Sequence, residues 1–129
     1  MRFVRIYAGN DERSHFEHRE LSMGERGSTP VLASEQVRFA QLAPGVDMDW
    51  HHAPARQFVI VLGGRCEITI GNGEYRQFAP GDLFLAEDLS GQGHKFRELD
   101  GPLRLAFVPL LDGFDLDRWL AGERSTGPA

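Results

Sequence analysis

The residues best suited to chemistry gather between positions 45 and 64, in the stretch GVDMDWHHAPARQFVIVLGG. Two adjacent histidines, His51 and His52, precede a proline, and Gln57 opens an apolar run that ends at a pair of glycines. Imidazole and amide groups bind metal ions or hydrogen-bond small molecules. The pattern therefore predicts polar, potentially ligating side chains at the mouth of a buried strand.

A further histidine follows a polar loop later in the chain. Residues 87–93 (EDLSGQG) form this loop, which delivers His94 to the start of a strand. Glu87 and Asp88 could supply an acid or a base, although turns of this composition are usually solvated. His94 and Gln57 belong either to a site or to the hydrogen-bonded edge of the core.

Composition excludes several classes of function. The chain has 129 residues, a net charge of -5 and arginines scattered along its length, which argues against nucleic acid as a partner. The longest apolar run, 58–62, is far too short to span a membrane. With no signal-peptide pattern and a single cysteine, Cys66, we expect a cytoplasmic protein whose thiol is buried and inert.

The elements that must position these residues are strands. Alternating or continuous apolar runs bounded by glycine and proline turns predict about ten short strands, typical of a sandwich or barrel. Gly63-Gly64 is expected to be a tight turn, and 71–73 (GNG) a hairpin. The main strands fall at residues 2–8, 35–40, 46–51, 57–62, 66–70, 74–78, 83–86, 94–99 and 103–111.

In the C-terminal part the spacing of apolar residues changes from that of a strand to that of a helix. Leu116, Trp119 and Leu120 have helical spacing, Asp115 is a plausible N-cap and Gly122 a plausible stop, which predicts one short helix. We expect a single domain over residues 1–122 and a disordered tail over 123–129.

Strand alternation does not decide which of the two adjacent histidines, His51 or His52, points into a pocket. Val46, Met48 and Trp50 alternate with Asp47, Asp49 and His51, so His51 falls on the acidic face and His52 on the apolar face. Either histidine could face a pocket. A bulge near Pro54 would bring both to one site. His15 and His18 lie in a charged segment and are either surface residues or contributors to a site or dimer contact.

Two motifs in order give the chain a resemblance to a known family. Gly45, His51, Gln57 and Gly64 are spaced as in the first cupin motif, and Gly73, 80–82 (PGD) and His94 resemble the second. The strings WHHAPARQFVIVLGG and FAPGDLFLAEDLSGQGH resemble small single-domain bacterial cupins of unassigned function. The resemblance implies an all-β double-stranded β-helix, a jelly-roll barrel with its pocket inside, commonly homodimeric.

The resemblance also implies a ligand set. Metal-bearing cupins hold divalent Fe, Mn, Ni, Cu or Zn with three histidines and a glutamate. His51 and His94 match the first and last histidines, whereas Ala53 and Gln57 stand where a histidine and the glutamate would be. The expected metal ligands are therefore His51, Gln57 and His94, with His52 as a substitute.

Two functions remain open at this point. One is a metal-dependent dioxygenase, isomerase or lyase with a depleted ligand set. The other is a metal-free, non-enzymatic barrel that holds a small molecule, with Phe58 as a further candidate for an apolar wall. Both predict a homodimer that binds a small organic ligand and neither nucleic acid nor membrane. The expected pocket residues are Trp50, His52, Val59, Phe84, Glu87 and Phe96.

Overall fold

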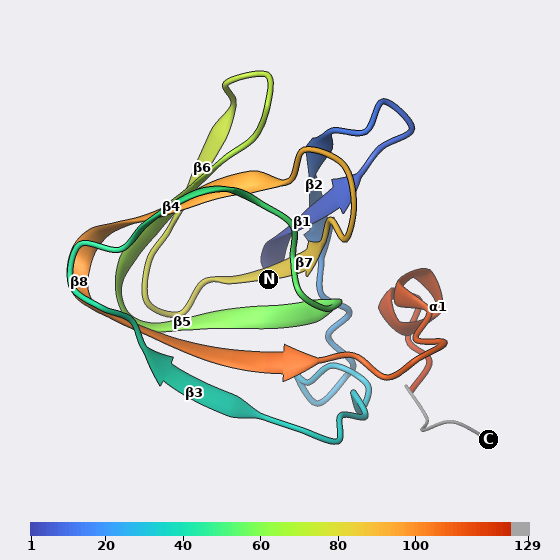
Figure 1. The fold of residues 1–129 in the computed structure, drawn as a ribbon. Helices are drawn as coiled ribbons and strands as arrows, with labels where there is room; N and C mark the ends of the chain where they lie inside the picture. The colour runs from blue at the N-terminus through green and yellow to red at the C-terminus, as the bar shows by residue number, and fades with distance from the viewer. Residues whose placement is uncertain (125–129) are drawn as a thin grey trace.

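A computed structural model describes residues 1–124, which form eight strands and one short helix. The predicted mostly-β fold with one short C-terminal helix is confirmed (Figure 1). The strands are β1 (Arg2–Ala8), β2 (Ser14–Glu20), β3 (Arg38–Gln41), β4 (Asp47–His51), β5 (Gln57–Thr69), β6 (Tyr75–Phe78), β7 (Leu83–Glu87) and β8 (His94–Pro109). The helix is α1 (Leu116–Leu120).

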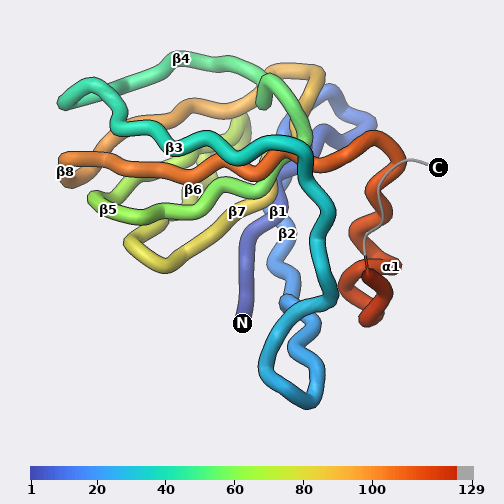
Figure 2. Tube along the Cα trace, turned by 90° about the horizontal axis from the view of Figure 1, so that it is seen from below, coloured from blue at the N-terminus to red at the C-terminus, as the bar shows by residue number. Residues whose placement is uncertain are grey.

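All eight strands belong to one mixed sheet, which curls without closing. The main path runs β2-β1-β7-β5-β8-β3, while β4 pairs with β8 and β6 pairs with β5. Only the β1–β7 pair is parallel among the strand pairs of residues 1–124. Figure 2 shows β3, β8, β5 and β7 lying side by side on one side of the molecule, with β4 beyond them. The sheet thus presents two layers that face each other.

The two long strands, β5 and β8, connect the layers because they pair along most of their length and each bends midway. The first half of β5 pairs with β7, and its second half pairs with β6. The expected turn at Gly63-Gly64 is wrong, since the chain continues through it as one strand with register shifts between Val61 and Cys66. Gly64 has φ +73°, and a Cβ there would lie 2.5 Å from the carbonyl oxygen of Asp100. Left-handed glycine here bends the strand against its neighbour rather than reversing it.

The hairpin expected at residues 71–73 is confirmed. Thr69 of β5 pairs with Tyr75 of β6, and the amide of Ile70 donates to the carbonyl of Glu74. The later prediction of two strands, 94–99 and 103–111, is replaced by the single strand β8.

The helix α1 covers the outer face of the sheet. Asp115 is its N-cap and accepts a hydrogen bond from the amide of Arg118, as predicted. Trp119 is buried against Phe58 and donates its indole N–H to the carbonyl of Pro30. No helix within residues 1–124 has the length and apolar character that crossing a bilayer requires.

Residues 123 and 124 of the segment expected to be disordered belong to the described part of the chain. The amide of Glu123 donates to the carbonyl of Arg118, and the Glu123 carboxylate accepts from the Arg118 guanidinium at 2.7 Å. Residues 125–129 lie outside the described part of the chain.

Candidate functional site

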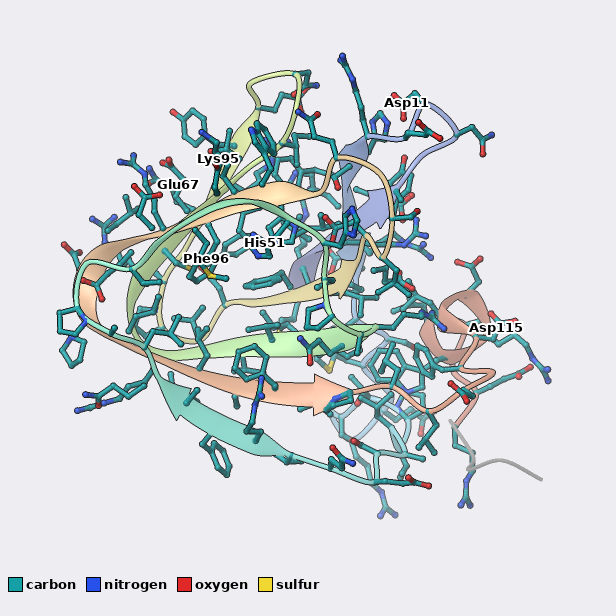
Figure 3. All side chains as sticks on the ribbon, in the orientation of Figure 1. Asp11, His51, Glu67, Lys95, Phe96 and Asp115 are labelled. Atoms are coloured by element: carbon teal, nitrogen blue, oxygen red, sulfur yellow. The ribbon has the colours of Figure 1, made fainter. Side chains whose placement is uncertain are left out.

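A cavity of about 380 Å³ lies between the two layers. That volume falls in the lower part of the range of small-molecule sites. Figure 3 shows His51 and Phe96 directed into the space inside the curled sheet, whereas Glu67 and Lys95 point away from it. The lining residues are Arg38, Leu42, Met48, His51, His52, Ala53, Pro54, Gln57, Val59, Phe84, Ala86, His94, Phe96, Leu105 and Phe107.

One wall of the cavity is a row of side chains that crosses the neighbouring strands β7, β5, β8 and β3. Directly paired residues on neighbouring strands present their side chains to the same face. Val59 of β5 pairs with Phe107 of β8 on one side and with Phe84 of β7 on the other, and Phe107 in turn pairs with Arg38 of β3. The row is therefore apolar in its middle and cationic at its edge.

The facing wall carries the histidines, and a β-bulge puts them there. Met48 pairs with Phe96 and His51 with His94, so three steps along β4 match two steps along β8. The extra residue reverses the alternation, which brings Met48 and His51 to the same face although their spacing is odd. The bulge expected near Pro54 thus lies earlier, between Met48 and His51. As a result the rings of His51 and His94 lie 4.6 Å apart, centre to centre.

Behind His94 a series of buried hydrogen bonds connects Ser14 of β2, through Asp88, to the cavity. The Asp88 side chain is 0% exposed, and its Oδ2 atom lies 2.5 Å from Nδ1 of His94. The same oxygen accepts the Ser14 hydroxyl at 2.7 Å. The other oxygen, Oδ1, is buried and has no hydrogen-bond partner within residues 1–124. Asp88 therefore holds His94 in place rather than facing solvent as its loop composition suggested.

These partners fix which ring nitrogen of each neutral histidine carries the hydrogen. Nδ1 of His94 faces a carboxylate oxygen, and Nδ1 of His51 lies 2.8 Å from the carbonyl oxygen of Asp49. Both oxygens are acceptors, so both Nδ1 atoms must donate. Nε2 is then the nitrogen with a free lone pair on each ring. The two adjacent imidazoles can each accept a proton or a hydrogen bond, or ligate a metal ion.

His52 also lines the cavity. The sequence left open which of the two adjacent histidines faces a pocket, and in the structure both do. The Nε2 atom of His52 bonds the carbonyl of Gly91 in the loop before β8, which fixes the opposite tautomer from that of His51. The same loop is pressed against β4 at Gly93, which has φ +77°. A Cβ at Gly93 would collide with the carbonyl group of His51. Only glycine lets the chain deliver His94 beside His51.

Gln57 is the third residue of the predicted ligand set. It is buried, lines the cavity and lies at the start of β5, where it pairs with Ala86 and with Pro109. The structure therefore brings His51, Gln57 and His94 to one cavity. Val59, Phe84 and Phe96 line it as well.

Several other candidates lie elsewhere. The Trp50 ring lies outside the cavity, 38% exposed, with Lys95 over its face. Glu87 pairs with Arg5 at 2.6 Å and Arg56 at 2.7 Å, which makes it part of a structural ion-pair cluster. Phe58 belongs to the outer core under α1, because the bulge-free start of β5 turns it away from Val59.

The two histidines of the N-terminal segment also lie outside the cavity lining. His15 lies 2.9 Å from the Asp11 carboxylate and stacks on Tyr7, and His18 accepts from the Arg76 guanidinium. Both are on β2, at one edge of the sheet. Their contacts explain them as edge-strand residues.

Sequence reasoning missed the cavity residues Arg38, Leu42, Ala86, Leu105 and Phe107, whereas one of its two alternatives put Met48 on the same face as His52. Only a correct strand register would have identified the missed residues. Arg38 is the most consequential omission, since alternation with Val37 and Phe39 made it look like the polar, outward face of its strand.

Three imidazoles and one neutral amide line the cavity, and Nε2 of one of these histidines, His52, is bonded to the carbonyl of Gly91. This donor set lacks the carboxylate that metal sites have in the family that the sequence resembles. Within residues 1–124 no group of three or more histidine, cysteine, aspartate or glutamate side chains is arranged to hold a metal.

No known protein family matches the chain, and no curated protein matches it. The function must therefore be inferred from the geometry of the cavity.

Proposed function

We propose that this chain binds a small organic molecule inside a cupin-type jelly roll, with His51, Gln57 and His94 as polar anchors. The observation that carries the proposal is the cavity itself, whose lining is mostly apolar and whose polar residues are His51, His52, Gln57, His94 and Arg38. Apolar pockets with a few fixed polar groups are the usual form of small-molecule sites.

The arrangement of strands supports the fold part of this proposal. In a jelly roll two facing layers are connected by strands that cross from one to the other. Strands β5 and β8 both do so, and the two motifs that resemble cupins fall on β4–β5 and on β6–β8. The open main path of the sheet ends at β2 on one side and β3 on the other.

The binding proposal is tested with a neutral probe that fits the cavity, 3-phenylpropanamide, by methyl NMR. We expect titration to shift the methyl signals of Val59, which is buried in the cavity wall, and to leave those of the exposed Val37 unchanged. His94→Asn should weaken binding by roughly tenfold, because a hydrogen bond to the probe's polar end is lost. Unchanged Val59 signals at millimolar probe would contradict the proposal.

A divalent-metal-dependent enzyme is the second candidate, favoured by one observation. Metal-ligating histidines donate their other ring N–H to an oxygen, and both His51 and His94 do so. Elemental analysis of protein purified without a metal-affinity tag distinguishes the two candidates. The binding proposal expects less than one equivalent of transition metal, falling further in His94→Ala. A full equivalent that survives chelation would establish the metal-dependent alternative instead.

A further inference from the structure

The cavity lining has an unbalanced set of charges. Within residues 1–124 the lining residues include one arginine, Arg38, and three histidines but no aspartate or glutamate, and the carboxylate behind the lining, Asp88, is already paired with His94. Arginine is charged at every physiological pH. The chain as a whole carries a net charge of -5, so this cavity departs from the surrounding surface. An occupant with a negative charge would complement it.

Arg38 is an exposed residue whose guanidinium stacks on the cavity wall. Its guanidinium carbon lies 4.6 Å from the centre of the Phe107 ring, and Phe107 lines the cavity too. Stacking on an aromatic face orients the planar guanidinium and leaves its N–H edge for a partner. No carboxylate within residues 1–124 forms an ion pair with Arg38, in contrast to Arg5, Arg56 and Arg97.

We infer that the ligand is a small organic acid, whose carboxylate is bound by Arg38 while its apolar body lies against Val59, Phe84 and Phe107. This inference rests on the proposed function and names the class of its ligand. A guanidinium offers two parallel N–H donors that match a carboxylate. One arginine without a cradle of backbone amides suits a monoanion better than a phosphate dianion.

The test compares two probes of the same shape, 3-phenylpropanoate and 3-phenylpropanamide, by isothermal titration at low salt. We expect the acid to bind the native chain at least roughly tenfold more tightly than the amide. Arg38→Gln should remove that preference and leave the affinity for the amide unchanged. Arg38→Lys should keep part of it, since the charge remains and the forked geometry is lost.

Arg104→Gln is the matched control. Arg104 is an exposed arginine of β8 that bonds Gln41 of β3 and does not line the cavity, so its loss should leave the preference for the acid intact. Equal affinity for acid and amide would overturn the inference while leaving the proposed function standing. A preference for the acid that persists in Arg38→Gln would also overturn the inference. Absence of binding by both probes would contradict the proposed function, and the inference with it.

Discussion

At the residue scale the site depends on one buried carboxylate. Asp88 receives hydrogen bonds from Ser14 and His94 at Oδ2, and no lysine or arginine within residues 1–124 forms an ion pair with it. Because that oxygen accepts, Nδ1 of His94 keeps its hydrogen and Nε2 keeps its lone pair. Asp88 is thus a positioning residue that determines how His94 meets a ligand.

Asp88→Asn should change the tautomer of His94. The amide NH₂ can donate to Nδ1, so the hydrogen moves to Nε2 and the ring presents a donor where it presented an acceptor. Nitrogen-15 NMR of the His94 ring measures this directly. Stability should fall by about 2 kcal/mol, because the buried hydrogen bonds that Ser14 and His94 make to a carboxylate are replaced by weaker ones with a neutral amide. Asp49→Asn is the control, since His51 bonds the backbone carbonyl there, and an unchanged His94 tautomer in Asp88→Asn would contradict the assignment.

At the element scale the site depends on irregularities in the strands. The bulge in β4 brings Met48 and His51 to one face, and the left-handed Gly93 lets the loop before β8 pack against the backbone of His51. Regular strands of the same sequence would separate the two histidines. The alignment of the imidazoles is therefore a property of backbone conformation rather than of side-chain type.

Gly93→Ala should destabilise the fold more than Gly73→Ala. Both glycines have positive φ, +77° and +89°, so both substitutions carry the strain of a left-handed alanine, about 1 kcal/mol. Only at Gly93 would the added methyl also strike the carbonyl of His51, whereas nothing lies within 4 Å at Gly73. We expect Gly93→Ala to cost about 2 kcal/mol beyond its control in urea unfolding. Equal costs would show that the loop moves freely away from β4.

At the scale of the whole molecule, the two layers enclose a core that excludes solvent from Cys66. This residue of β5 is fully buried between β6 and β8, and burial, aided by the charge of Asp82, raises the pKa of its thiol to about 12. The thiol is therefore protonated as well as inaccessible at neutral pH. Its expected inertness follows from the closure of the core around it.

Labelling of Cys66 should report global unfolding. At pH 8 the folded chain should react with a thiol reagent only as fast as it unfolds, and one thiol per chain should react at once in denaturing urea. Cys66→Ser should abolish the signal. Prompt reaction of the native chain would contradict the burial of β5.

Homodimerisation stays a prediction, but a different surface of the chain now supports it. In the apolar stretch 58–62, Phe58, Val59 and Val61 are already buried within the molecule between β7 and β8, and only Leu62 is exposed, by 52%. The edge strand β3 instead exposes Phe39 by 73%. Sedimentation equilibrium should show twice the 14.5 kDa chain mass at micromolar concentration, and Phe39→Asp should lower it. A native chain that sediments only as the 14.5 kDa species would refute the prediction.

The sequence by itself determined the fold class and several of the elements. Alternation, turn residues and the N-cap at Asp115 depend on neighbours along the chain, and so the mostly-β fold, the 71–73 hairpin, β4 and α1 could be read directly. Motif spacing also selected His51, Gln57 and His94, which the structure brings to one cavity.

Only the tertiary structure decided which side chains meet. Gly63-Gly64 bends a continuous strand because the backbone of Asp100 lies against it, and that contact joins residues far apart in sequence. The bulge in β4 is defined by its register with β8, so alternation alone could not place His51, His52 or Met48. Arg38 reaches the cavity through its pairing with Phe107, and Asp88 reaches His94 through burial beside Ser14. Cross-strand register and burial are long-range properties, and they determine the chemistry of this site.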